Sequence, residues 1–278
     1  RHWVHLASNL NVTANAIESV KFPLERRIWM TYPGQPATYY SSAATGGLDK
    51  PDRIARVLDD GTTQLTRLEY NSSGRLTRRI DPLGREMRLN YAANQIDVLG
   101  IEQRSNAGFV PLAAFTYNAR HRPLTLTDAA GQTTSFTYNA AGQLTSATDA
   151  LGQQTQYAYD ALGYLTRVVD ANGATAVSFT YDAFGRLATR TDSGGHTTGF
   201  EYDALDRLTR VGFPDGSATL YGWERLDLAS VTDRLGRVTR HQYDANRQRV
   251  AATDALGRTT RYGYYPNGAL KTLTDANG

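Results

Sequence analysis

The sequence contains no cysteine, which excludes a disulfide framework and any thiolate site. It also lacks a long apolar run. The longest one, near Val110, is far too short to span a bilayer, so we expect no membrane-spanning segment. Charges of one sign never gather, because 30 Lys and Arg are interspersed with 27 Asp and Glu. This two-sign surface, with a net charge of +3, argues against a nucleic-acid partner.

The chain also has little apolar content for its length. Hydrophobic residues make up 40% of the 278 residues and the mean hydropathy is −0.48, whereas a compact globule of this length buries most of its unfolded surface. We therefore expect an extended or hollow shape with walls one sheet thick. The 17 Tyr, 8 Phe and 3 Trp argue against disorder, since disordered segments are poor in such residues.

What the sequence does have is an internal repeat of about 21 residues, over roughly residues 65–278. In most units a Tyr precedes Asn or Asp, and an Asp follows eleven residues after the Tyr, as Asp170 follows Tyr159. A Gly comes three residues after that Asp. The units that show the Tyr-Asn or Tyr-Asp step most clearly begin at Tyr138, Tyr159, Tyr181, Tyr202 and Tyr243.

The pattern Asp-x-x-Gly is the second element of the repeat. About two such patterns are expected by chance at this composition, and the chain holds eleven. Asp at the first position bonds the backbone two residues on, and Gly at the fourth takes the positive φ of a type I turn with a G1 bulge. The pattern predicts tight turns at these pairs: Asp81 and Gly84, Asp128 and Gly131, Asp149 and Gly152, Asp160 and Gly163, Asp170 and Gly173, Asp182 and Gly185, Asp192 and Gly195, Asp233 and Gly236, Asp254 and Gly257.

Substitutions within the pattern follow the same turn chemistry. Asn71 and Asn139 replace the Asp, and Asp206 replaces the Gly with another residue that tolerates left-handed backbone. Glycoside hydrolysis needs two carboxylates about 5–10 Å apart that flank the bond, but these Asp recur at opposite ends of ~20 Å strands, so no pair is privileged. Neither an EF-hand loop nor a Gly-rich calcium repeat is present. We expect turn formation, with no metal and no cofactor.

Between the turns lie five to seven residues with period-2 alternation, which is typical of β-strands. The repeat Tyr and the aromatic residue two positions earlier fall on one face. We expect this ladder to hold the sheet together through cross-strand packing. Stacking on sugar rings is the alternative. The ladder comprises Tyr117, Phe136, Tyr138, Tyr157, Tyr159, Phe179, Tyr181, Phe200, Tyr202, Trp223, Tyr243, Tyr262 and Tyr264.

The five histidines are scattered along the chain. His241 occupies the aromatic position two before Tyr243, which predicts a packed ring rather than a base. His2 and His5 are close in sequence but have no third ligand near them. No Ser/His/Asp motif and no phosphate-binding loop is present, so the sequence does not predict an enzyme.

The first 64 residues differ from the regular array. Residues 26–32 have the composition of a strand, and residues 33–51 are rich in Gly, Pro and Ser. Residues 54–58 and 62–70 predict a further hairpin around Asp59-Asp-Gly61. We interpret residues 1–64 as diverged repeats with one long loop, and residues 65–278 as the array proper.

The stretches YDALGYLTRVVDANG (residues 159–173) and YDAFGRLATRTD (residues 181–192) resemble the YD repeats of the rearrangement-hotspot (RHS) family. Similar repeats occur in bacterial polymorphic toxins, in the shell component of insecticidal toxin complexes and in teneurins. Residues 26–35 (RRIWMTYPGQ) and 56–64 (RVLDDGTTQ) resemble stretches that precede such arrays. The fold class that follows is all-β: tandem hairpins forming a long, coiled antiparallel sheet, part of a spiral shell.

The resemblance implies a hollow shell around a C-terminal toxin, which in bacterial members is released by an aspartyl autoprotease in a cap region. Asp81-Pro-Leu-Gly84 looks like part of the protease motif, but it occupies an ordinary turn of the repeat and no paired motif follows. The sequence also begins at Arg1 and stops within a repeat, so we expect a fragment of a longer chain. Only the wall function is carried over.

We therefore expect a structural module that encloses a C-terminal toxin or effector of its parent chain. The alternative is a cell-surface module that binds carbohydrate or protein through the aromatic ladder and loops. The resemblance implies a secreted or cell-surface protein, with immunity, secretion or glycan partners. Open edge strands invite pairing with another chain, so self-association is a further expectation.

Overall fold

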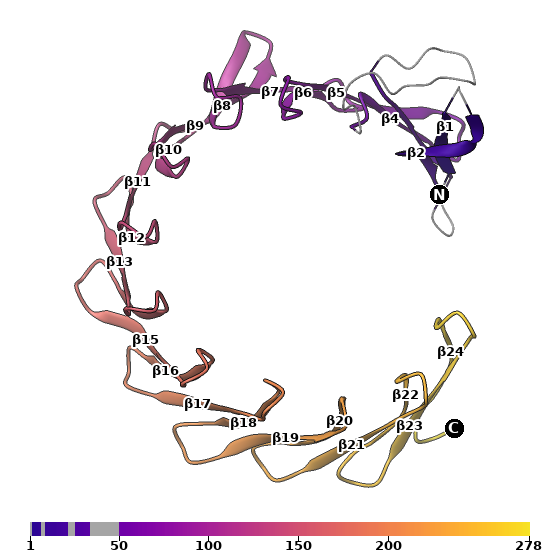
Figure 1. Cartoon of the computed structure of the whole chain (residues 1–278), viewed down its shortest axis with the longest axis vertical. Coiled ribbons are helices and arrows are strands. Elements are labelled where there is room, and N and C mark those ends of the chain that lie inside the picture. Colours follow the sequence, from indigo (N-terminus) through magenta and orange to yellow (C-terminus); the bar gives the residue numbers. More distant parts are fainter. Residues whose placement is uncertain (1, 7–8, 22–25, 34–49) are drawn as a thin grey trace. The chain divides into compact units, whose positions relative to one another are not determined.

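The computed structural model describes residues 2–6, 9–21, 26–33 and 50–278, and these residues contain 24 β-strands and no helix (Figure 1). The strands are β1 (His2–Leu6), β2 (Asn9–Val20), β3 (Ile28–Thr31), β4 (Arg53–Val57), β5 (Thr63–Tyr70), β6 (Leu76–Ile80), β7 (Glu86–Tyr91), β8 (Val98–Ser105), β9 (Gly108–Tyr117), β10 (Pro123–Asp128), β11 (Thr133–Tyr138), β12 (Leu144–Thr148), β13 (Gln154–Tyr159), β14 (Leu165–Val169), β15 (Thr175–Tyr181), β16 (Leu187–Asp192), β17 (Thr197–Tyr202), β18 (Leu208–Gly212), β19 (Ala218–Glu224), β20 (Asp227–Thr232), β21 (Val238–Tyr243), β22 (Arg249–Thr253), β23 (Thr259–Tyr264) and β24 (Leu270–Thr274).

The chain divides into two compact units. Unit 1 comprises residues 1–138 and 147–153, and unit 2 comprises residues 139–146 and 154–278. In unit 1, strands β1 to β11 form one consecutive series, in which each strand from β1 to β10 pairs antiparallel with the next strand along the chain. In unit 2, strands β13 to β24 do the same. The predicted all-β, antiparallel hairpin architecture is therefore confirmed.

The register of one hairpin shows how the repeat sets the two faces of the sheet. Tyr181 of β15 lies opposite Leu187 of β16, and Thr180 lies opposite Thr189, so Ala188 is an extra residue. This β-bulge shifts the pleat by one position. As a result, Tyr181 and Leu187 share the aromatic face, while Thr180 and Thr189 share the polar face and bond each other at 2.6 Å.

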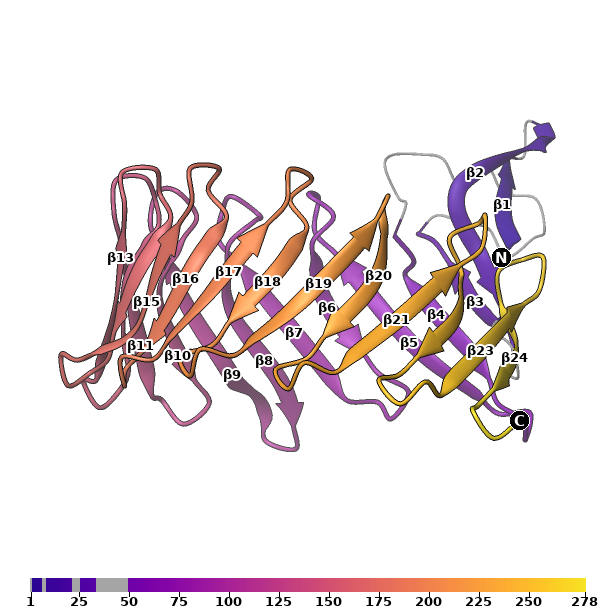
Figure 2. The same cartoon turned by 90° about the horizontal axis from the view of Figure 1, so that it is seen from below.

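The hairpin ends of unit 2 lie along two opposite edges of its sheet (Figure 2). We call the edge after the repeat Tyr the tyrosine edge; its turns comprise residues 160–163, 182–185, 203–206, 224–227, 244–247 and 265–268. The other is the far edge, with turns at residues 170–173, 192–195, 213–216, 233–236, 254–257 and 275–278.

Almost nothing is buried behind the sheet. Among residues whose side chains are described, Tyr32 and Ala251 are the buried apolar ones, at 4% and 7% exposure. Ser19 and Glu86 are also buried. A two-layered fold would bury one apolar residue in two along each strand, so both units are single sheets. The polar composition of the sequence follows from this thinness.

The N-terminal strand predictions also agree with the structure. Residues 26–32 contain β3, and the predicted hairpin at residues 54–70 is β4 and β5 around the turn at Gly61, whose φ is 84°. Strands β1 and β2 had no signal of their own in the sequence. The predicted long loop at residues 33–51 lies mostly outside the described residues.

Candidate functional site: the turns and the aromatic face

The turn Asp160–Gly163 shows what the acidic residue of the repeat does. The carboxylate oxygen Oδ1 of Asp160 accepts hydrogen bonds from the backbone N–H groups of Leu162 and Tyr164, at 3.0 and 2.9 Å. The Gly163 N–H donates to the Asp160 carbonyl at 3.1 Å, and Gly163 has a φ of 89°. The carboxylate thus closes a type I turn with a left-handed fourth residue.

The same pair of backbone bonds to Oδ1 occurs at all nine Asp residues that the sequence singled out: Asp81, Asp128, Asp149, Asp160, Asp170, Asp182, Asp192, Asp233 and Asp254. Their glycines, Gly84, Gly131, Gly152, Gly163, Gly173, Gly185, Gly195, Gly236 and Gly257, all have φ between 76° and 89°. The structure places these Asp at separate turns. In the described part of the chain no group of three His, Asp or Glu could hold a metal ion.

An Arg directly after the turn Gly occupies the second carboxylate oxygen in several units. Arg258 Nε donates to Asp254 Oδ2 at 2.7 Å, and Arg237 Nε donates to Asp233 Oδ2 at 2.6 Å. The Arg258 guanidinium holds the pKa of Asp254 below its ordinary value. At Asp233 the backbone N–H of Arg237 is the main cause of the lowered pKa. These carboxylates are therefore ionised and fully engaged within their own turns.

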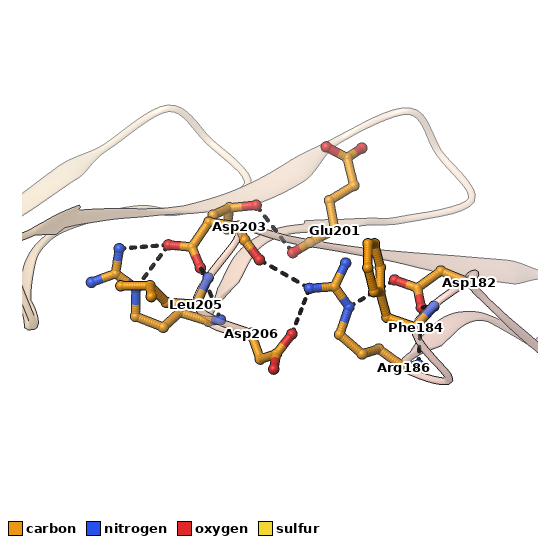
Figure 3. Close-up of polar contacts among 9 residues, drawn as sticks. Asp182, Phe184, Arg186, Glu201, Asp203, Leu205 and Asp206 are labelled. Carbon is orange, nitrogen blue, oxygen red and sulfur yellow. Dashed lines mark hydrogen bonds and ion pairs between the residues drawn. The ribbon is translucent and has the colours of Figure 1, made fainter.

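Arg186 also joins two successive turns of the tyrosine edge (Figure 3). Its Nε donates to Asp182 Oδ2 at 2.7 Å, and its Nη1 donates to the Asp203 carbonyl at 2.9 Å and to Asp206 Oδ1 at 2.8 Å. The guanidinium lies 4.9 Å from the ring centroids of Phe184 and Tyr202, a distance at which cation–π attraction acts. Arg186 thus fixes the spacing of two hairpin ends.

The residue after the turn makes equivalent links elsewhere on this edge. Gln143 Nε2 donates to the Gly163 carbonyl at 2.7 Å, and Arg207 Nη1 donates to the Arg225 carbonyl. Lys50 Nζ bonds the Gly74 carbonyl in unit 1. The Gln143 and Arg207 links run from the residue after one turn to the carbonyl of the left-handed residue in the next turn, Gly163 or Arg225. Lys50 does not follow a turn of the repeat, but it bonds the same kind of carbonyl. The sequence shows these residues but gives no signal for their reach.

The repeat Tyr anchors its strand to the preceding hairpin. Tyr159 Oη donates to the Leu144 carbonyl at 2.9 Å, fifteen residues earlier. Trp223 replaces the Tyr and keeps the bond through Nε1, which donates to the Leu208 carbonyl at 2.9 Å. Further examples are Tyr91, Tyr138, Tyr181, Tyr243 and Tyr264. Burial raises the pKa of Tyr159 and Tyr181, so their hydroxyl groups remain donors at neutral pH.

The remaining ladder residues lie on the same face but do not pair with one another across strands. Tyr157 faces Val168, and Phe200 faces Val211. Phe179 faces Arg190, so the partners opposite these rings are aliphatic side chains or the stem of an arginine. Of the ladder, Tyr117 ends β9, Phe136 and Tyr138 lie on β11, Tyr157 and Tyr159 on β13, Phe179 and Tyr181 on β15, Phe200 and Tyr202 on β17, Trp223 on β19, Tyr243 on β21, and Tyr262 and Tyr264 on β23.

Two polar clusters of unit 1 had no signal in the repeat. Buried Glu86 is contacted by Arg78, Arg88 and Arg104, at 2.6, 3.2 and 3.3 Å, and the Arg78 bond lowers its pKa. Asp97 accepts hydrogen bonds from Asn94 and from His121 Nδ1, at 2.7 and 2.9 Å.

Asp97 belongs to one of the eleven Asp-x-x-Gly patterns, yet this pattern is no turn, because its Gly100 lies within β8 without a positive φ.

His241 lies opposite Ala252, and burial lowers its pKa. The side chains of His2 and His5 lie outside the described residues. In the part of the chain that is described, no helix has the length and apolarity that a membrane crossing requires.

Comparison with known proteins identifies related repeats. A family model described as RHS Repeat matches residues 117–153, 138–175, 177–218 and 223–259. None of the curated proteins matches the chain.

Three solved structures are similar in fold. A crystal structure of TcdB2-TccC3-Cdc42 has a TM-score of 0.57 and 12% identity, and one of TcdB2-TccC3 has a TM-score of 0.57 and 13% identity; both cover 90% of this chain and 16% of that chain. A crystal structure of TcdB2-TccC3-TEV has a TM-score of 0.53 and 15% identity, covering 81% of this chain and 12% of that one. At such low identities the likeness shows a shared fold alone. This chain spans 16% of the length of the first two structures.

Proposed function

Because this chain belongs to the RHS-repeat family, we propose that it is a wall segment of an RHS-repeat shell enclosing a C-terminal toxin or effector of a longer bacterial chain. The thickness of the sheet is the observation that carries the proposal. Within each unit, consecutive strands pair antiparallel along the chain, and Tyr32 and Ala251 are the buried apolar residues among those described. A single layer has two large faces and no interior of its own, which suits a wall.

The contacts of the turns support the same role. A sheet without a core must be stabilised within its own plane, because apolar burial is the main driving force in ordinary domains. Here the Asp160 carboxylate closes its turn, Arg186 joins two turns, and Tyr159 anchors a strand to the preceding hairpin. All three contacts leave the faces of the sheet available. The Asp and aromatic residues of the repeat thus have structural rather than catalytic roles in this proposal.

Protease protection of the parent chain tests the enclosure. The variant replaces Asp160 and Asp182 by Ala and Gly163 and Gly185 by Val, which removes two turn-closing carboxylates and two left-handed glycines. We expect the segment C-terminal to the array to become cleavable while strands far from the change persist. The control is Asp160→Asn with Asp182→Asn, since Asn118 and Asn139 close turns through their amide oxygens. Equal cleavage of the C-terminal segment in all three proteins would contradict the proposal.

A second candidate function, carbohydrate binding, is favoured by the open aromatic face. The hydroxyl groups of Tyr157 and Tyr221 have no hydrogen-bond partner among the described residues, and both residues are partly exposed. Tyr rings with a free hydroxyl suit sugar rings, which offer both apolar faces and hydroxyl groups. A glycan array tests this, with Tyr157→Ala and Tyr262→Ala as controls. Signals that are absent, or unchanged in both variants, would count against it.

We further propose that residues 1–64 are a diverged start of the array that continues through residues 65–278. Their strands β3, β4 and β5 pair in the same order and direction as the later hairpins. The cargo of the parent chain and its immunity and secretion partners are part of the same proposal.

A further inference from the structure

The third position of several turns holds an apolar side chain that the turn does not use. At Leu162 the turn uses the backbone N–H, which donates to Asp160 Oδ1, while the side chain is 82% exposed. Other turns of the same geometry hold Asn172 or Asn246 at this position. A polar residue therefore satisfies the turn equally well. Exposed leucines that occur singly need no explanation, but a recurrent one at a fixed position has a cause outside the turn.

These apolar side chains form a row along the tyrosine edge of unit 2. Four consecutive turns carry Leu162, Phe184, Leu205 and Leu226, with exposures of 82%, 80%, 61% and 55%. Consecutive turns on one edge are two strands apart, so neighbouring tips are spaced by about 10 Å and the row spans about 30 Å. We call these four residues the apolar row. The next turn carries Asn246, where the row ends.

The spacing of the row is fixed by the links between its turns. Arg186 bonds both Asp182 and the Asp203 carbonyl, and so holds Phe184 and Leu205 on neighbouring turns (Figure 3). Arg207 bonds the Arg225 carbonyl of the turn that carries Leu226. Tyr164 reaches the turn of Phe184 so closely that a Cβ at Gly185 would lie 2.1 Å from its hydroxyl oxygen. A rigid row binds without losing much conformational entropy.

The far edge of the same unit offers a surface with matching spacing. Its consecutive turns at residues 233–236 and 254–257 carry Leu235 and Leu256, which are 77% and 78% exposed. These tips are also two strands apart. The charges of the two edges are complementary as well. The four turns of the row contain six acidic residues and three arginines, counting the residue after each turn, whereas the two far-edge turns contain two acidic residues and three arginines.

We propose that the apolar row docks on the far edge of a second copy of this chain, where its tips interdigitate with Leu235 and Leu256. The two surfaces are different, so the contact is heterologous and leaves one free surface of each kind at the ends of the assembly. Copies therefore add edge to edge in an open series. This contact is independent of whether the sheet encloses a cargo.

Sedimentation velocity over a range of concentrations tests the contact. The row variant carries Leu162→Asn, Phe184→Asn, Leu205→Asn and Leu226→Asn. The far-edge variant carries Leu235→Asn and Leu256→Asn. Asn occupies the third turn position at Asn172, Asn246 and Asn267, so Asn at positions 162, 184, 205, 235 and 256 keeps the turn chemistry. Leu226 lies in a two-residue turn whose left-handed residue is Arg225. Circular dichroism checks that both variants remain folded. We expect the wild type to associate as its concentration rises, and each variant to associate at least ten-fold more weakly.

A mixture of the two variants is the decisive measurement. The far-edge variant keeps an intact row and the row variant keeps intact far-edge leucines, so a 1:1 mixture should form a dimer and stop there. Asn246→Leu should extend the row by one tip and strengthen association. A wild type that stays monomeric overturns the proposal, and so does a mixture without dimer. Association that disappears with Leu270→Lys and Leu273→Lys on edge strand β24, but persists in the row variant, also overturns it, because strand pairing is then the cause.

Discussion

Replacing Gly185 by Ala tests whether a turn glycine is required only because its backbone is left-handed or also because its surroundings leave no space for a Cβ. Gly185 and Gly195 have almost the same φ, 78° and 79°. A Cβ at Gly195 would meet nothing within 4 Å, whereas a Cβ at Gly185 would lie 2.1 Å from Tyr164 Oη and 2.7 Å from its Cζ. The two sites therefore separate the cost of a left-handed Ala from the cost of displacing Tyr164.

The magnitudes follow from the two contributions. A left-handed L-residue costs about 1–2 kcal/mol, and this is the whole expected effect of Gly195→Ala. Gly185→Ala also moves the Tyr164 ring off Tyr181, on which it stacks at 4.8 Å between centroids with an interplanar angle of 27°. Losing such a pair costs about 0.5–1.5 kcal/mol more. We expect a total of about 2–3 kcal/mol for Gly185→Ala.

Native-state amide hydrogen exchange in β15 and β16 measures the difference, because protection reports the free energy of local opening. Each 1.4 kcal/mol corresponds to about a ten-fold change in protection. We expect about ten-fold lower protection for Gly195→Ala and about fifty-fold or more for Gly185→Ala. In a Tyr164→Ala background the extra loss at Gly185 should disappear, which makes a double-mutant cycle. Equal effects of the two glycine substitutions in the wild-type background would refute the reasoning.

Three further predictions concern the turns and the tyrosine bonds. Gln95 has a φ of 61°, and its turn is closed by backbone bonds from Gln95 N–H to the Ala92 carbonyl and from Ala92 N–H to the Asp97 carbonyl. Gln95→Gly should therefore stabilise the chain by up to about 1 kcal/mol in denaturant titration; destabilisation would contradict this. Tyr159→Phe removes the bond to the Leu144 carbonyl and should cost about 1 kcal/mol, seen as faster amide exchange in β12 and β13, while unchanged exchange would argue that water replaces the hydroxyl. The bond from the Arg207 side chain lowers the pKa of Asp203 below 3.8, so its contribution to stability is present above pH 3.8 and is lost as the pH falls through the folded-state pKa. Asp203→Asn keeps the amide oxygen as acceptor but does not titrate, so it should weaken the acid dependence of exchange in this turn; an identical dependence would exclude Asp203 as its source.

The fold could be predicted from the sequence because its determinants are local. Asp160 and Gly163 specify a turn by themselves, and the alternation up to Tyr159 specifies which face each side chain takes. Pairing between neighbouring strands then leaves little choice of topology, because each turn is too short for anything but a hairpin. Strands β1 and β2 lack this repeat pattern, so the sequence did not predict them.

The contacts between turns could not be predicted in the same way. Arg186 and Gln143 occupy the same position of the repeat, and a sequence shows only that both are long and polar. Their reach to the next turn depends on the spacing of hairpin ends in three dimensions. The pattern at Asp97 is a false signal for a turn. It has the Asp-x-x-Gly sequence, but a longer loop before it places Gly100 within strand β8, and only the structure reveals this.

The tyrosine bond spans fifteen residues and the Arg186 link to Asp206 spans twenty, so the contact order of the array stays low however many units it has. Each hairpin therefore finds all of its partners in the units just before and just after it. Such a chain can gain structure progressively during translation, N-terminus first, without waiting for a distant segment. The sheet would then already be present when whatever follows it in the chain leaves the ribosome.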